Sequence, residues 1–360
     1  MKKIMFITSS VSSGGAERVI SILSKKFVKN DYDVIILTTF IGQGSLDFYK
    51  LDPRVKRISL KSYFQKKLSF IDFFKKFFIF KKVVARNKPD IIISFTSHIN
   101  ILSLISLFNL KIPIIVSERV DPFKHKINFF LTFLRPIVYK FAKKVICQTT
   151  DLSNKIKRSW NLKNVVTIAN PLFEKIPKVN RWNRRKNIVL NVGRLENQKG
   201  HDMLIKAWSM LNNKKDWKLL IIGSGAEKKN LISMVKSLNL TKEIQIKSTT
   251  KNIWKEYNKS KIFILTSRYE GYPNVLIEAM AMGNAVISTD CNTGPREIIK
   301  KNGILTEINT QSVYKGLQLL IFDQKKQKKF YAEYLNTRKR FNSDKVFVKW
   351  LKIINQALMN

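Results

Sequence analysis

Acidic side chains are scarce in this sequence. Its 360 residues include 25 Asp and Glu against 67 Lys and Arg, which gives a formal net charge of +42 at pH 7. Such an excess of positive charge predicts attraction to a polyanion: nucleic acid, an anionic membrane surface or a phosphorylated substrate. The hydrophobic fraction of 44% is large enough for a sizeable core and argues against wholesale disorder.

Cysteine and histidine are rare as well. The two cysteines, Cys147 and Cys291, are far apart, and each lies in an apolar run. This count excludes a disulfide framework and a cysteine-based zinc site, and it fits a reducing cytoplasm. The three histidines are too scattered along the chain to indicate a metal cluster.

Long hydrophobic runs are also missing. The apolar stretch Ile4–Ile7 is too short for a signal peptide and is better interpreted as a first buried strand. The most apolar segment, Ile101–Leu110, contains two Ser and one Asn and falls well short of the ~20 residues that a membrane span needs. We therefore expect no transmembrane helix.

Short β-branched runs alternate with amphipathic stretches along most of the chain. Strands are predicted at 3–8, 33–39, 55–60, 90–95, 112–117, 144–149 and 165–169, and again at 187–192, 217–222, 243–246, 261–266, 285–289 and 303–306. Apolar residues three and four apart predict helices between them, for example at 16–27 and 70–84. This alternation is typical of an α/β fold with parallel sheets covered on both faces.

The alternation of predicted strands and helices is interrupted once. Residues 174–186 are polar, rich in Lys and Arg and carry Pro177, a composition typical of a linker. We predict Rossmann-like domains at 1–173 and 187–342, with a closing helix in 343–360. Two doubly wound domains facing a central cleft would bind ligands at the carboxyl ends of their strands.

Two predicted strands end in glycine-containing turns. Gly14-Gly15 follows the first strand, where backbone N–H groups and a helix dipole favour an anion, although such turns are common. The strand at 187–192 leads into a loop with Arg194 and Lys199, whose charges suit a diphosphate leaving group. Both cations could equally belong to the general basic surface.

A third motif strengthens this interpretation. The strand at 261–266 is followed by Arg268-Tyr269-Glu270-Gly271-Tyr272-Pro273 and a helix start. Glu270 is thereby placed on a loop at the strand end, and Glu278 one to two turns into the helix. The first helical N–H groups, at Asn274 and Val275, would face a ligand. In a chain with so few acidic residues, two carboxylates around an anion-binding helix start are hard to explain as merely part of a solvent-exposed polar face.

These motifs, in this order, resemble glycosyltransferase family 4, the retaining sugar-nucleotide enzymes of GT-B fold. The resemblance covers essentially the whole chain and includes the Gly14-Gly15 turn, the Gly193-Arg194…Lys199-Gly200 loop and the pair Glu270 and Glu278. Gly-Gly-Ala-Glu-Arg and Ser117-Glu118-Arg119 are similar to the branch that builds bacterial exopolysaccharide, O-antigen and lipid-linked oligosaccharides.

The resemblance implies a role for each motif. Glu270 would contact the donor sugar and be central to catalysis, and Glu278 would bind the nucleotide ribose. Arg194 and Lys199 would hold the diphosphate and replace a metal, so no metal or other cofactor is expected. The residues implied to bind the nucleotide sugar are Gly14, Gly15, Arg194, Lys199, Glu270, Gly271, Asn274, Val275, Leu276 and Glu278.

The acceptor side departs from the family pattern. Relatives often carry a histidine after the strand at 112–117, where this chain has Arg119, which cannot act as a base at neutral pH. His98 is the candidate substitute, although a lone histidine on a loop is more often incidental. Glu17, Glu118 and Arg119 are the acceptor-side candidates. Lys247-Ser248 stands where relatives often have a glycine near the nucleobase.

Basic and aromatic residues alternate in one stretch and predict contact with an anionic membrane surface. The residues concerned are Lys66, Lys67, Phe73, Phe74, Lys75, Lys76 and Phe77. A second stretch runs from Phe123 to Phe133. The rings could instead simply cover the sheet, since every surface helix has an apolar stripe.

Together these features predict a retaining, metal-independent hexosyltransferase. The expected donor is a nucleotide sugar, with UDP favoured by family habit, and the expected acceptor is a polyprenyl-diphosphate-linked glycan on the cytoplasmic face of the inner membrane. A transferase with a soluble acceptor remains an alternative. So does a basic nucleic-acid-binding protein, although the chain has no recognised nucleic-acid module, so we expect no nucleic-acid partner.

Overall fold

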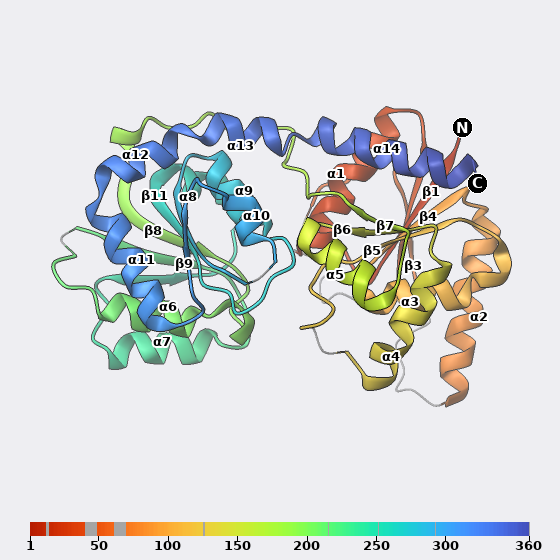
Figure 1. The fold of residues 1–360 in the computed structure, drawn as a ribbon, viewed down its shortest axis with the longest axis horizontal. Helices are drawn as coiled ribbons and strands as arrows, with labels where there is room; N and C mark the ends of the chain where they lie inside the picture. Colours follow the sequence, from red (N-terminus) through yellow and green to blue (C-terminus); the bar gives the residue numbers. More distant parts are fainter. Residues whose placement is uncertain are drawn as a thin grey trace. The chain divides into compact units, whose positions relative to one another are not determined.

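The structure is a computed structural model that describes residues 1–11, 14–39, 49–60, 70–124, 127–214, 216–250, 252–291 and 293–359, with the backbone alone for 70–76. The chain forms two compact units. The first comprises Met1–Pro171 with Ser343–Asn360, and the second comprises Leu172–Asn342. Each unit contains one parallel sheet with helices packed on it (Figure 1).

The first unit contains a seven-stranded parallel sheet in the order β3-β2-β1-β4-β5-β6-β7. Its strands are β1 (Lys3–Thr8), β2 (Asp33–Thr38), β3 (Lys56–Ser59), β4 (Ile91–Phe95), β5 (Ile114–Ser117), β6 (Lys144–Cys147) and β7 (Val165–Thr167). The central strands β1 and β4 are fully buried except for Lys3, because helices cover both of their faces. Such burial explains their continuous apolar runs.

Helices of the first unit pack on the two faces of this sheet. They are α1 (Gly15–Lys29), α2 (Phe70–Asn87), α3 (Ser97–Ser106), α4 (Phe129–Val138), α5 (Thr150–Trp160) and α14 (Ser343–Met359), with the 3-10 turns η2 (Phe108–Leu110) and η3 (Tyr139–Phe141). The helices α1 and α14 share one core, in which the Phe27 and Phe347 rings lie 4.8 Å apart (Figure 1). The expected closing helix therefore belongs to the first unit, although it ends the chain.

The second unit contains a six-stranded parallel sheet in the order β10-β9-β8-β11-β12-β13. Its strands are β8 (Lys186–Val192), β9 (Lys218–Ile222), β10 (Ile244–Lys247), β11 (Ser260–Leu265), β12 (Ala285–Thr289) and β13 (Ile304–Thr306). Its helices are α6 (His201–Ser209), α7 (Lys228–Ser237), α8 (Ile253–Lys259), α9 (Asn274–Ala281), α10 (Pro295–Ile299), α11 (Thr310–Phe322), α12 (Gln324–Ala332) and α13 (Tyr334–Arg340), with the turns η4 (Trp182–Arg184) and η5 (Asn197–Lys199). The largest core cluster of this unit joins α6, α7 and α11 to one face of the sheet.

All thirteen predicted strands are present, with ends that differ by at most two residues. The segment predicted as a linker is packed in the second unit. Residues 174–186 belong to the second unit, where Trp182 is buried and the Arg185 guanidinium donates to the carbonyls of Tyr257 and Ser260 at 3.3 and 3.0 Å. The polar composition reflects the exposure of most of this segment, and it concealed the buried Trp182 and Arg185 and the hydrogen bonds that the carbonyls of Pro177 and Lys178 accept from Arg338 and Asn258. None of the described helices is long and apolar enough to cross a bilayer.

Candidate functional site

Two loops at the carboxyl edge of the second sheet are bonded to each other. The loop after β8 spans residues 193–200, and the loop after β11 spans residues 266–273. The Arg268 N–H donates to the Gln198 carbonyl at 2.8 Å, and the Gln198 side-chain amide donates to the Tyr269 carbonyl at 2.9 Å. The sheet register places β8 beside β11, so motifs far apart in the sequence become adjacent.

Glycine is required where these loops pack. Gly200 has φ +62°, and a Cβ atom there would lie 2.1 Å from the Thr266 carbonyl oxygen. Gly294 has φ +82°, and its Cβ would lie 2.5 Å from the Gly271 carbonyl oxygen. Any other residue would combine a left-handed backbone with a clash against main chain, so these glycines fix the shape of the edge.

Lys199 and Glu270, both identified from sequence motifs, form an ion pair with Nζ and Oε1 2.6 Å apart. Only 15% and 8% of their side chains are exposed. Ser267 Oγ donates to the same carboxylate oxygen at 2.6 Å, and Thr293 Oγ1 donates to the Glu270 carbonyl at 2.6 Å. The carboxylate is thus held rigidly beside a cation at the strand end.

Arg194 is the more exposed of the two predicted diphosphate-binding cations. Its guanidinium contacts Glu196 Oε1 at 3.0 Å and Gln198 Oε1 at 3.3 Å, both on its own loop. A neighbouring arginine, Arg268, binds both carboxylate oxygens of Asp202 at 2.9 and 2.8 Å. Burial opposes ionisation of Asp202, but the Arg268 hydrogen bonds prevail and hold the Asp202 pKa below its usual range.

The helix α9 begins at Asn274, directly after Pro273. The side chains of Asn274 and Val275 are half-buried at this end. Leu276 is different, because its side chain is fully buried and its N–H already donates to the Pro273 carbonyl at 3.1 Å. Leu276 therefore supports the helix start and offers no N–H to a ligand.

Glu278, the predicted ribose contact, is 2% exposed in the structure. The Tyr257 hydroxyl donates to Glu278 Oε2 at 2.9 Å, and this hydroxyl also reaches the Val275 carbonyl at 3.4 Å. Sequence reasoning missed Tyr257, Ser267 and Thr293, which fix the two glutamates. Ser267 could have been found from its place at the end of a buried strand, but Tyr257 carries no local signal.

His201 follows Gly200 at the start of α6 and is 2% exposed. Burial, together with the positive charge of Lys199, lowers the pKa of His201 to about 4. Its imidazole is therefore neutral near pH 7, and neither ring nitrogen has a hydrogen-bond partner among the described residues.

The acceptor-side candidates lie in the first unit, at the carboxyl edge of its own sheet, and so do Gly14 and Gly15, which the sequence assigned to the nucleotide sugar. Gly14 precedes α1, and a Cβ there would lie 2.1 Å from Glu17 Oε2, so the glycine leaves room for this carboxylate. Gly15 is the first residue of α1. Glu17 also accepts from Ser10 Oγ at 3.4 Å.

Arg119 lies two residues beyond the end of β5 and is half-buried. Its guanidinium donates to Asn170 Oδ1 at 2.9 Å and to Ser117 Oγ at 3.2 Å, and it lies 5.2 Å from the centre of the Phe95 ring. Burial lowers the pKa of Arg119 to about 10, while the charges of Glu17 and Glu118 oppose this shift. Arg119 is thus positively charged near pH 7 and cannot act as a base there.

Glu118, an acceptor-side candidate from the sequence, does not reach the surface of the first unit. It is fully buried, and its two carboxylate oxygens accept from Ser97 Oγ and the Tyr139 hydroxyl, each at 2.6 Å. Residues of α3 and η3 thus enclose it, and we propose that Glu118 positions the adjacent Arg119 and does not contact the acceptor itself. His98, expected on a loop, is an exposed residue in the first turn of α3.

Only one of the predicted membrane-contact residues, Phe77, has a described side chain. Lys66 and Lys67 lie outside the described residues, and so do the side chains of Phe73, Phe74, Lys75 and Lys76. Phe77 is half-buried, and its ring lies 6.4 Å from that of Phe78. Further along α2, Phe80 is fully buried against the sheet, so part of this aromatic stripe belongs to the core.

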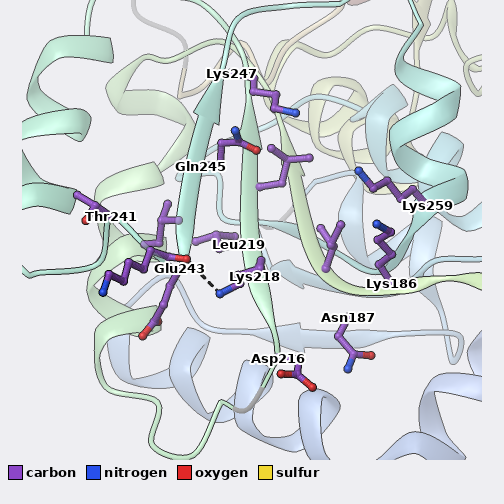
Figure 2. Close-up of a pocket in the computed structure, with 14 residues that line it drawn as sticks. Lys186, Asn187, Asp216, Lys218, Leu219, Thr241, Glu243, Gln245, Lys247 and Lys259 are labelled. Carbon is purple, nitrogen blue, oxygen red and sulfur yellow. Dashed lines mark hydrogen bonds between the residues drawn. The ribbon is translucent and has the colours of Figure 1, made fainter.

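A hollow of about 450 Å³ lies over β8, β9 and β10 of the second unit (Figure 2). Lys186, Lys218, Gln245 and Lys247 line it, and none of Arg194, Lys199, Glu270 and Glu278 does. It is therefore separate from the loops described above. Within the described part of the chain, no group of three or more His, Cys, Asp or Glu side chains could hold a metal ion.

Comparisons with known proteins identify the family of this chain. Residues 13–172 match the family described as "Glycosyltransferase Family 4", and residues 173–335 match "Glycosyl transferases group 1". The amylovoran biosynthesis glycosyltransferase AmsD of Erwinia amylovora is 32% identical over 99% of this chain and 100% of its own. An α-1,4-N-acetyl-D-galactosaminyltransferase of Campylobacter jejuni, named for an undecaprenol-diphosphate-linked glycan, is 30% identical over 99% of both chains.

Solved structures show the same fold. The Anabaena protein HepE in complex with UDP-glucose aligns with a TM-score of 0.83 at 16% identity over 99% of this chain and 100% of its own. The Staphylococcus aureus protein TarM, solved with UDP, aligns with a TM-score of 0.82 at 17% identity over 99% and 100%. The fold is GT-B, and the chain belongs to glycosyltransferase family 4.

Proposed function

We propose that this glycosyltransferase moves a hexose or N-acetylhexosamine from a UDP-linked donor to a polyprenyl-diphosphate-linked glycan, with retention at the anomeric carbon. The observation that carries the proposal is the Lys199–Glu270 pair at the edge of the second sheet. HepE and TarM were solved with UDP or UDP-glucose, and the Campylobacter relative is named for a lipid-linked glycan. These relatives suggest both substrates.

The donor diphosphate would bind between cations and a helix start. The planar guanidinium of Arg194 would donate two hydrogen bonds to phosphate oxygens, and the Lys199 ammonium would pair with the same group. The N-terminus of α9 would add the N–H groups of Asn274 and Val275. Gly271 is buried where the loop turns toward α9, and Glu278 would accept from a ribose hydroxyl. These groups are in place before reaction, so they stabilise the developing charge without reorganisation.

The reaction would proceed on one face of the sugar. The bond between the anomeric carbon and the β-phosphate oxygen breaks as an acceptor hydroxyl oxygen bonds to the same carbon from the same side. The hydroxyl proton passes to the departing phosphate, so UDP leaves as the protonated diphosphate. Glu270 orients the sugar hydroxyls, and Arg194 and Lys199 stabilise the leaving group, the part that a metal plays in other transferases.

The first unit would position the acceptor. Glu17 and Arg119 lie at its sheet edge with Asn170, and Arg119 would bind an acceptor phosphate or hydroxyl. His98 is exposed on α3 and available for the proton-transfer or binding role that a histidine has in relatives. We place this work at the cytoplasmic face of the inner membrane, where a polyprenyl carrier is anchored.

A donor and acceptor screen tests the proposal. Purified protein is incubated with a panel of UDP- and GDP-sugars and a short-chain polyprenyl-diphosphate-linked acceptor, and the products are identified by mass spectrometry and by the anomeric coupling in NMR spectra. We expect one α-linked sugar to be added from a UDP donor with an α-anomeric configuration. Transfer only to a lipid-free saccharide would favour a soluble acceptor, and thermal stabilisation by DNA but not by UDP would favour nucleic-acid binding.

A further inference from the structure

The helix α4 exposes its aromatic side chains to solvent. Phe129, Phe130 and Phe133 are 89%, 66% and 69% exposed. The opposite face of the helix is already packed, because Arg135 and Val138 are buried against the first unit. The rings are therefore not part of the core, and their exposure needs another explanation.

These rings continue into a larger surface. Phe129, Phe133, Ile137 and Phe141 follow one another at spacings of four along α4 and η3, and all four are exposed. Phe108 of η2 lies against Phe141 with ring centres 5.4 Å apart, and these two residues are 61% and 59% exposed. We call Phe108, Phe129, Phe130, Phe133, Ile137 and Phe141 the aromatic face.

The charge around the aromatic face has one sign. Between residues 97 and 144 the sequence contains two acids, Glu118 and Asp121, and both are buried. Lys111, Lys124 and Lys140 of the same segment are exposed. Lys140 directly precedes Phe141, and Lys111 directly follows η2. Exposed rings flanked by lysines, without an exposed carboxylate in the segment, complement an anionic lipid surface.

We propose that the aromatic face docks the first unit onto the surface of an anionic bilayer. Its rings would enter the boundary between headgroups and acyl chains, while Lys111, Lys124 and Lys140 pair with lipid phosphates. Rings in this layer lose their contact with water, which removes the cost of exposing them. The inference rests on the proposed function only for its purpose, which is to bring the enzyme to a lipid-linked acceptor.

This surface differs from the one expected from the sequence. The predicted contacts were centred on residues 66–77, whereas the aromatic face is formed by α4, η2 and η3. Phe129, Phe130 and Phe133 belong to the second basic and aromatic stretch of the sequence. Phe108 and Phe141 could not be assigned to it, because only the fold brings η2 and η3 together.

The test compares two double variants of the full chain. In the first, Phe129→Ser and Phe133→Ser remove two rings of the aromatic face. In the matched control, Leu319→Ser and Phe322→Ser remove two apolar side chains of α11 that are 46% and 52% exposed in the second unit. Each protein is sedimented with vesicles of phosphatidylglycerol and phosphatidylethanolamine, and with neutral phosphatidylcholine vesicles, after circular dichroism and thermal melting have verified the fold.

We expect wild type and control to bind the anionic vesicles, and the aromatic-face variant to bind them about tenfold or more weakly. Equal vesicle binding by the two double variants would overturn the proposal. The aromatic face could instead pair two copies of the chain. A wild-type dimer that the variant converts to a monomer, without any change in vesicle binding, would also overturn the proposal.

Transfer to a short-chain, water-soluble acceptor separates this inference from the proposed function. We expect this activity to be unchanged in the aromatic-face variant, since the rings lie outside the proposed substrate contacts. Loss of vesicle binding with normal transfer supports both ideas. Vesicle binding by a wild-type protein that transfers no sugar would reject the proposed function and leave the docking surface standing.

Discussion

Lys199 Nζ lies 2.6 Å from Glu270 Oε1, although 71 positions separate the two residues in the sequence. The pair exists because β8 and β11 are neighbours in the sheet and the loops that follow them are bonded together. Such a nearly buried pair holds the carboxylate and the ammonium in a fixed orientation. A donor diphosphate would bring its negative charge to the same ammonium, while the carboxylate remains available for sugar hydroxyls.

Glu270 should be needed for transfer beyond its place in the fold. We expect Glu270→Gln to lower kcat by about a hundredfold or more, since it removes the charge but keeps the shape. Ser267 and Thr293 still bond the segment, so the variant should fold, with a lower melting temperature because Lys199 loses the charge opposite it. Glu307→Gln, which removes an exposed carboxylate of the same unit, is the control and should transfer normally. Wild-type turnover by Glu270→Gln would exclude a catalytic role for this residue.

Arg194 should contribute to donor binding and not to stability. Its side chain is 64% exposed, so Arg194→Ala should change the free energy of unfolding by no more than about 0.5 kcal/mol. Loss of the guanidinium that would bind the diphosphate should nevertheless weaken UDP binding by about tenfold or more, measured by calorimetry at low salt. Arg184→Ala removes another exposed arginine of the second unit and serves as the comparison. Equal UDP affinities in the two variants would contradict the assignment.

Gly200 and Gly193 belong to the same loop but should respond differently to a methyl group. Gly200→Ala forces a left-handed φ and places Cβ 2.1 Å from the Thr266 carbonyl, so we expect a loss of about 2 kcal/mol or more in stability. A Cβ on Gly193 meets its nearest atom, in the Lys199 side chain, at 3.5 Å, which is an ordinary contact. Thermal melting of the two variants measures the difference. Similar melting temperatures would mean that the loop can shift to accept the methyl group.

Much of this architecture follows from local sequence. Ile4–Ile7 and Ile91–Ile93 are apolar throughout because parallel strands are buried on both faces, so no alternation with polar residues is needed. The three motifs were found because glycines and charges at strand ends are visible in sequence. The short distance between Lys199 and Glu270 could not be predicted from the sequence, since it depends on which strands become neighbours.

Other features depended on residues distant in the sequence. Glu118 was an acceptor-side candidate from its place after a strand, but Ser97 and Tyr139 come from other elements and enclose it. Tyr257 reaches Glu278 from α8, and no motif marks it. The exposed rings of α4 had the same spacing as a core stripe, and only the packing of Arg135 and Val138 showed which face points inward.

Tyr139 should stabilise the acceptor side through Glu118. Burial, and next the negative charge of Glu118, raise the pKa of Tyr139 well above its usual value, so its hydroxyl stays protonated and donates. Tyr139→Phe leaves one oxygen of a fully buried carboxylate without this donor and should cost about 1–3 kcal/mol. We also expect a higher acceptor KM with unchanged UDP affinity, because Arg119 adjoins Glu118 in the sequence while Arg194 and Lys199, the proposed diphosphate contacts, lie in the other unit.

Tyr314→Phe is the matched control, since it removes the hydroxyl of a partly buried tyrosine packed on the second core. It should leave stability and both substrate affinities near wild type. An acceptor KM that stays at the wild-type value in Tyr139→Phe, despite a lower melting temperature, would limit the role of Tyr139 to stability and reject the positioning role of Glu118.

His201 should make the second unit sensitive to acid. Its pKa is about 4 in the folded state, below the ordinary 6.5 of an unfolded chain, because burial and the charge of Lys199 disfavour the imidazolium. The unfolded state therefore binds the proton first as the pH falls. The contribution of this residue to stability is fully present above pH 6.5 and is lost between pH 6.5 and pH 4, by up to about 3 kcal/mol.

His201→Leu isolates this effect. Leucine has a similar size and removes two buried ring nitrogens that lack hydrogen-bond partners among the described residues, so the variant should be about as stable as wild type at pH 7.5. Thermal melting at pH 7.5, 6, 5 and 4.5 should then show a steeper fall for wild type than for His201→Leu, since other titrating groups are common to both proteins. Parallel pH profiles would show that His201 is protonated, or solvated, in the folded state.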